Sequence, residues 1–180
     1  MENSNTSSKS SYLQFGVFFS LLMILSFVII YVLDVDLIEN PLVGTLSSIF
    51  SYFIFPVIFI YLGISTYKKN NLGFISLTEC LKVGVSIVFI AALIFAIFNL
   101  IFNFIFPEYL EEILGQTRKI MLKQNPNMTD EQLEMGISMS RKFSSPLLLV
   151  PFTLLIFSFL GLIYSLIIGL IVKKDKAHFN

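Results

Sequence analysis

Residues 83–106 read VGVSIVFIAALIFAIFNLIFNFIF, a run that contains no Asp, Glu, Lys, Arg or His. Residues 13–33, 42–67 and 146–172 form three more stretches with the same property. At a rise of about 1.5 Å per residue, a helix over the first run is about 36 Å long and can cross a hydrocarbon core of about 30 Å. The sequence therefore predicts an all-α membrane protein with a four-transmembrane-helix bundle.

The composition supports a membrane class and excludes several others. Hydrophobic residues make up 56% of the 180 residues and the mean hydropathy is +0.83, which leaves too few polar side chains to cover a soluble globule. Twelve basic and twelve acidic side chains give zero net charge, so we expect the lipid bilayer and no nucleic acid as a partner. The single cysteine, Cys80, excludes an intrachain disulfide and a cysteine zinc cluster.

The chain is predicted to hold one integral membrane domain, residues 12–175. Residues 1–11 are rich in Ser and Asn and are predicted to be a disordered segment, and residues 176–180 form a C-terminal tail. The first apolar run exceeds the about 7–15 residues of a signal-peptide core, and no A-x-A site follows it. We therefore expect this helix to be retained.

Lysines set the expected orientation. The first loop, residues 34–40, carries acids and no Lys or Arg, whereas the second loop and the C-terminal tail are rich in lysine. Because Lys and Arg in short loops favour the cytoplasm, both termini are predicted to lie inside. The candidate interface anchors are Lys68, Lys69, Lys173 and Lys174.

Residues 107–145 form the one sizeable polar segment, and the pattern predicts an extracytoplasmic amphipathic helical hairpin. The first helix is expected at Glu108–Lys123, and a Thr129/Gln132 capping box opens a second one at Asp130–Phe143. Two uses stay open: the hairpin caps the bundle at the lipid headgroups, or it docks a partner or ligand. Its methionines are read as adaptable apolar contacts rather than copper ligands.

Other local signals mark helix boundaries. Asn40-Pro41 and Ser145-Pro146 each predict a capping residue before a first-turn proline. Ser76 and Glu79 form a capping box, which predicts a helix start near Leu77. Pro56 is expected to kink the second span.

The uncharged stretches also limit the chemistry. Proton relays and coupled transport use ionisable residues inside the membrane, and none lies within the four stretches. No H-E-x-x-H, G-x-S-x-G or P-loop pattern occurs. We therefore expect no catalytic residue, no metal or cofactor, and no enzymatic activity.

Two sets of polar or small residues remain within the stretches. Asn99 and Asn103 share one helix face, and we expect a neighbouring helix to satisfy their hydrogen bonds; a polar ligand pocket is the alternative. Small residues recur at four-residue spacing at Gly161, Ser165 and Gly169, which permits close helix packing within the monomer or in a homodimer.

The order of these features resembles a known family. A span ends in Gly63-Ile-Ser-Thr-Tyr67-Lys-Lys, a short Asn/Gly loop leads to Gly73-Phe-Ile-Ser-Leu77, and the third span ends in Phe104-Ile-Phe-Pro107. The last span carries Leu160-Gly-Leu-Ile163 and ends in Lys-Lys. This pattern is similar to a family of small bacterial membrane proteins classed as domain of unknown function 4199. The resemblance implies four spans in the bacterial inner membrane and no known activity.

The favoured function is that of a non-enzymatic structural or accessory protein that acts through partners. The first alternative is a non-energised subunit of a transport or export complex, with a polar path lined by Asn99, Asn103 and the serines Ser47, Ser48 and Ser51. The second is a lipid-acting enzyme, which needs Lys68, Lys69 and Glu79 to converge at the membrane interface.

Overall fold

The computed structural model describes residues 2–36 and 38–175, and within this part of the chain it contains helices and no β-strand. The elements in chain order are α1 (Glu2–Val32), α2 (Pro41–Ile49), the π-helical turn η1 (Phe50–Ile54), α3 (Phe55–Asn70), α4 (Leu77–Ile105), α5 (Pro107–Gln124), α6 (Asp130–Phe143) and α7 (Pro146–Val172). The predicted all-helical class is confirmed. The predicted tail, residues 176–180, lies outside the described residues.

Four segments are long and apolar enough to cross a membrane: Tyr12–Val32, Pro41–Asn70, Leu77–Ile105 and Leu147–Val172. Large apolar side chains cover their outward surfaces; Leu155 is 66% exposed and Ile171 is 80% exposed. Contiguous apolar surface of this kind is compatible with lipid and not with water. The fold is that of a membrane protein with four candidate spans, as the uncharged stretches predicted.

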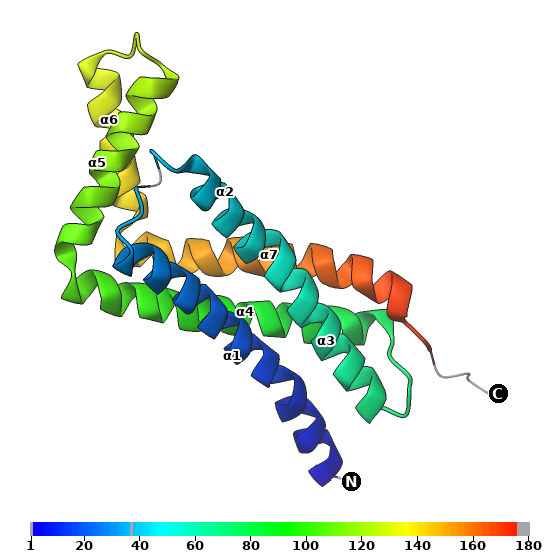
Figure 1. Cartoon of the computed structure of the whole chain (residues 1–180). Coiled ribbons are helices and arrows are strands. Elements are labelled where there is room, and N and C mark those ends of the chain that lie inside the picture. Colours follow the sequence, from blue (N-terminus) through cyan, green and yellow to red (C-terminus); the bar gives the residue numbers. More distant parts are fainter. Residues whose placement is uncertain (1, 37, 176–180) are drawn as a thin grey trace.

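The two ends of the bundle carry different elements (Figure 1). The N-terminus, the α3–α4 connection and the end of α7 lie at one end, which we call the terminal end. At the other end, α5 and α6 turn steeply away from the line of α4 and α7. The chain changes direction at Phe106, because this residue leaves the helical conformation and ends α4, and Pro107 opens α5.

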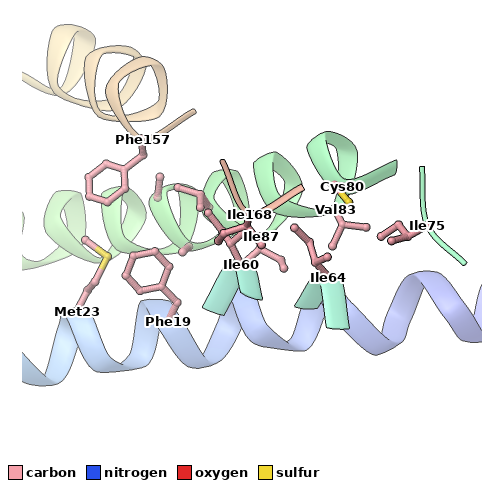
Figure 2. Packing of buried hydrophobic residues seen from close by; sticks show 13 residues of the cluster. Phe19, Met23, Ile60, Ile64, Ile75, Cys80, Val83, Ile87, Phe157 and Ile168 are labelled. Carbon is pink, nitrogen blue, oxygen red and sulfur yellow. The ribbon is translucent and has the colours of Figure 1, made fainter. Parts of the chain in front are cut away.

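Helix α4 is the centre of the bundle, since it packs against α1, α3 and α7. The shared core draws Phe19 from α1, Ile60 from α3, Ile87 from α4 and Phe157 from α7 (Figure 2). The Phe19 ring stacks on Phe59 at 5.5 Å between centroids. Because lipid is as apolar as these side chains, close packing rather than water exclusion holds the helices together.

Pro56 disrupts the second span in a specific way. A proline has no backbone N–H, so the carbonyl four residues earlier, that of Tyr52, loses its α-helical donor. The chain passes through the π turn η1 here, and the Phe55 N–H donates to the Phe50 carbonyl five residues back. The Tyr164 hydroxyl of α7 donates to the Tyr52 carbonyl at 3.0 Å and replaces the missing donor.

Both predicted capping boxes are confirmed, at Ser76/Glu79 and at Thr129/Gln132. Asn40 and Ser145 occupy the N-cap positions before first-turn prolines, as predicted, but neither side chain accepts a cap hydrogen bond. Asn40 instead donates to the Asp36 carbonyl, and Ser145 donates to the Lys142 carbonyl.

The start of α1 also differs from the sequence expectation. The structure continues this helix back to Glu2, through residues 2–11, for which composition predicted disorder. No Gly or Pro occurs between residues 2 and 15, so nothing in the backbone interrupts the helix that the first span begins.

Candidate functional site

The small-residue stripe of α7 lies against α4 of the same chain. Ser165 is fully buried and faces Gly84, and its hydroxyl donates to the Gly161 carbonyl. A Cβ built at Gly169 would lie 2.9 Å from the Cβ of Cys80. These contacts place Gly161, Ser165 and Gly169 at a close interface between α7 and α4, so this face is covered within one chain.

Asn99 and Asn103 lie on α4 near its end beside α5. The Asn99 carboxamide donates to the Phe95 carbonyl at 3.0 Å, and Asn103 donates to the Asn99 carbonyl at 2.8 Å. These acceptors belong to their own helix, whereas a neighbouring helix was expected. A side chain that bonds back to a carbonyl four residues earlier gains partial satisfaction without a partner helix.

The terminal end carries a network of polar contacts. Lys68 of α3 donates to the Val172 carbonyl at 2.7 Å and so caps α7. Residues Ile75 and Lys174 exchange backbone hydrogen bonds of 3.0 and 2.9 Å, which tie the chain after α7 to the connection before α4. The Lys174 ammonium lies 5.4 Å from the Phe74 ring centroid.

Glu79 joins this network from α4. Its carboxylate accepts the Tyr67 hydroxyl at 3.0 Å and the Ser76 N–H at 2.7 Å. A cavity of about 530 Å³ lies beside it and opens between the α3–α4 connection and Lys174. Of the predicted interface anchors, Lys68 is partly buried, whereas Lys69, Lys173 and Lys174 are exposed.

The α5–α6 pair, residues Pro107–Phe143, is stabilised by apolar contacts between its two helices. Leu114 of α5 and Leu133 and Ile137 of α6 are buried. A Cβ built at Gly136 would collide with the end of the Met121 side chain, which shows how closely the two helices approach.

Two ion pairs join α5 to α6 on one edge of the pair. Arg118 binds Glu134, and Arg141 makes two hydrogen bonds to Glu111, of 2.5 and 2.7 Å. The hydrogen bond from Arg141 lowers the pKa of Glu111, and the same contact raises the pKa of Arg141. Bidentate pairing of this kind fixes geometry as well as charge.

The other edge of the pair is apolar. Met135, Met139 and Phe143 recur at four-residue spacing and are 61%, 54% and 47% exposed. At 3.6 residues per turn, Met139 lies on the side of α6 opposite Glu134 and Arg141. We name these two surfaces the charged edge (Glu111, Arg118, Glu134, Arg141) and the apolar edge (Met135, Met139, Phe143).

Aromatic side chains pack the first turn of α5 against α1 and α4. The Tyr109 ring packs edge-on against Phe27 and Tyr31 of α1 and Phe102 of α4, at centroid distances of 5.5, 5.5 and 5.3 Å. Burial raises the pKa of Tyr109, and the nearby Glu112 raises it further. Each such ring pair contributes about 0.5–1.5 kcal/mol beyond area burial, so the α5–α6 pair is held firmly at its base.

Sequence reasoning missed most of these long-range partners. The Tyr67–Glu79 bond, the Ile75–Lys174 pairing and the Tyr109 ring cluster join residues far apart in the chain, and no local pattern marks them. The charged edge had a partial signal, because each helix of the predicted hairpin carries an acid and an arginine seven positions apart, which places them on one helix face: Glu111 and Arg118, and Glu134 and Arg141.

One protein family matches this chain. No curated protein and no solved structure matches the chain. Residues 14–174 match the family described as "Protein of unknown function (DUF4199)". The resemblance drawn from the sequence is confirmed by this match over most of the chain, and the protein belongs to the DUF4199 family.

Proposed function

We propose that this chain is a non-enzymatic accessory protein of the bacterial inner membrane, which holds the α5–α6 pair as an extracytoplasmic hairpin for a partner protein. The observation that supports this most is the division of the pair into a charged edge and an apolar edge. A prefolded surface binds without the entropy cost of ordering a loop, which favours its use in recognition.

The distribution of charge supports the orientation. Lys68 and Lys69 lie in the last turn of α3, and Lys173 and Lys174 follow α7, so these lysines lie at the terminal end. Asp34 instead lines a pocket with Tyr109 and Glu112 of α5. Lysine-rich short segments favour the cytoplasm, so the terminal end is assigned to the inside and the α5–α6 pair to the outside.

The turn of α5 away from α4 supports a role for each edge. When α4 and α7 cross the bilayer, α5 and α6 run along its surface (Figure 1). The apolar edge continues toward the lipid-facing start of α7, because the Phe143 ring lies 5.6 Å from that of Phe152. We assign the apolar edge to the lipid headgroups and the charged edge to water and a partner.

Site-specific photocrosslinking in native membranes tests the assignment. Ser138 lies four residues after Glu134 and three before Arg141, so it belongs to the side of the charged edge, and it is exposed. Met139, the next residue, lies on the apolar edge. A benzoylphenylalanine at Ser138 is expected to give a discrete protein adduct, whereas the same group at Met139 reacts with lipid.

The matched position makes the outcome decisive. The two crosslinker positions are neighbours on the same helix, so each variant is the control for the other. Equal membrane insertion and folding of the two variants are checked first. A protein adduct of the same size from both positions, or lipid adducts alone from Ser138, contradicts the assignment of the charged edge to a partner.

A further inference from the structure

A cavity of about 200 Å³ lies within the depth of the spans, on the side of the bundle nearest α5. Three elements line it: Tyr52 of η1; Phe95, Ala96 and Asn99 of α4; and Leu149, Thr153, Ile156 and Phe157 of α7. Tyr52 and Ile156 are 42% and 36% exposed, so the cavity opens sideways between the second and fourth spans.

The cavity exists because packing changes along α7. Near the terminal end, Gly161, Ser165 and Gly169 bring α7 close to α4. Beyond them the stripe ends, and the bulkier Thr153 and Leu149 face Ala96, which is small and 1% exposed. None of the residues that line the cavity belongs to α2, so this helix does not fill the space.

Two polar side chains in this apolar site have unused hydrogen-bonding capacity. Within the described chain, Asn99 uses its amide group for the Phe95 carbonyl, while its carboxamide oxygen accepts no hydrogen bond. The Thr153 hydroxyl has no hydrogen-bond partner among these residues either. No fully enclosed side-chain polar atom in the described part lacks a partner, so these two oxygens are accessible to a ligand.

A polar group at this depth has no water to bond, so a ligand that supplies the missing partner gains from the site. We infer that the cavity binds an uncharged molecule from the lipid phase with a compact aromatic body and one hydroxyl group. The rings of Tyr52, Phe95 and Phe157 suit the body, and Asn99 and Thr153 suit the hydroxyl group. A dry cavity of about 150 Å³ holds benzene, so this one suits roughly eight to ten non-hydrogen atoms.

The cavity lies within the spans and shares no lining residue with the α5–α6 pair, so binding there is independent of the proposed partner. The chain has no tryptophan, so Tyr52→Trp places a single fluorescent reporter at the rim of the cavity. We propose quenching by 4-bromobenzyl alcohol and by 4-bromotoluene, with the protein in phosphatidylcholine nanodiscs. Tyr61→Trp, an exposed position on α3, is the reporter for contact with ligand dissolved in lipid.

The expected result is saturable quenching of the Tyr52→Trp reporter and linear quenching of the Tyr61→Trp reporter. Adding Asn99→Leu raises the half-saturation concentration of the alcohol about threefold to tenfold, the value of one hydrogen bond, and leaves that of bromotoluene unchanged. Adding Ala96→Phe fills the cavity and abolishes saturation, whereas Ile97→Phe, on the exposed side of α4, does not.

Linear quenching at the cavity reporter overturns the inference, as does saturation that persists with Ala96→Phe. If Asn99→Leu changes the half-saturation concentrations of 4-bromobenzyl alcohol and 4-bromotoluene by the same factor, Asn99 does not recognise a hydroxyl group. That result also overturns the inference. Ile156→Trp, at the same rim, provides a second reporter if Tyr52→Trp lowers the yield of folded protein.

Discussion

The packing of α4 against α7 predicts that Gly84→Ala destabilises the protein. A Cβ at this position would lie 2.8 Å from the Ser165 Cβ and 2.9 Å from the Ile60 Cγ2, and closer still to the Ser165 hydroxyl. Favourable carbon contacts lie at about 3.5–4.0 Å. Ser165 is fully buried, so it cannot move away without shifting α7.

The magnitude follows from two opposing terms. Overpacking a tight interior costs about 1–3 kcal/mol, and the better helix propensity of alanine returns up to about 1 kcal/mol. We expect a net loss of about 1–2 kcal/mol in the free energy of unfolding, measured by titration with sodium dodecyl sulfate in mixed micelles. Gly115→Ala is the control, because no atom lies within 4 Å of a Cβ there.

A double substitution separates packing from general effects. Adding Ser165→Gly removes both colliding atoms of α7, so the pair should show a favourable coupling of about 1 kcal/mol or more in a double-mutant cycle. If Gly84→Ala unfolds at the same detergent fraction as Gly115→Ala, the close approach of α4 and α7 is refuted.

Three further predictions follow from other contacts. Tyr164→Phe leaves the Tyr52 carbonyl without its donor and should cost about 0.6–1.7 kcal/mol in the same detergent titration; no loss would contradict the proline argument. A tag at Asn127 should be accessible only from outside the cell, and labelling from the cytoplasm would reverse the proposed orientation. Because the folded-state pKa of Glu111 is lowered, its stabilisation is present above the ordinary glutamate pKa and is lost as pH falls through the folded value. An NMR titration should show a low midpoint that rises with Arg141→Gln, and an unchanged midpoint would exclude the ion pair.

Local signals predicted the elements well. Uncharged stretches located the four candidate spans, and the capping boxes at Ser76 and Thr129 located the starts of α4 and α6. These signals succeed because each depends on residues within one or two helical turns. Asn40 and Ser145 also mark helix starts, although their side chains donate to the carbonyls of Asp36 and Lys142 and accept no cap hydrogen bond.

Features that join distant residues were not predictable. Pro56 predicted an irregularity in the second span. It did not predict that the Tyr164 hydroxyl would donate to the Tyr52 carbonyl in place of the missing backbone N–H. The spacing of Asn99 placed it on one face of α4, but the cavity beside it depends on where Thr153 of α7 comes to lie. Such partners depend on the registry of whole helices, which no local pattern specifies.

The sequence by itself determined that this chain is a helical membrane protein with four candidate spans, because the absence of charge over such lengths leaves few other environments. Tertiary structure decided what the polar residues do. In the folded chain, Lys68 caps the end of α7 and Glu79 caps the start of α4. The α5–α6 pair has a charged edge and an apolar edge, and a cavity lies beside Asn99. The physical reason is that hydropathy is a property of each segment, whereas contacts depend on how the segments pack.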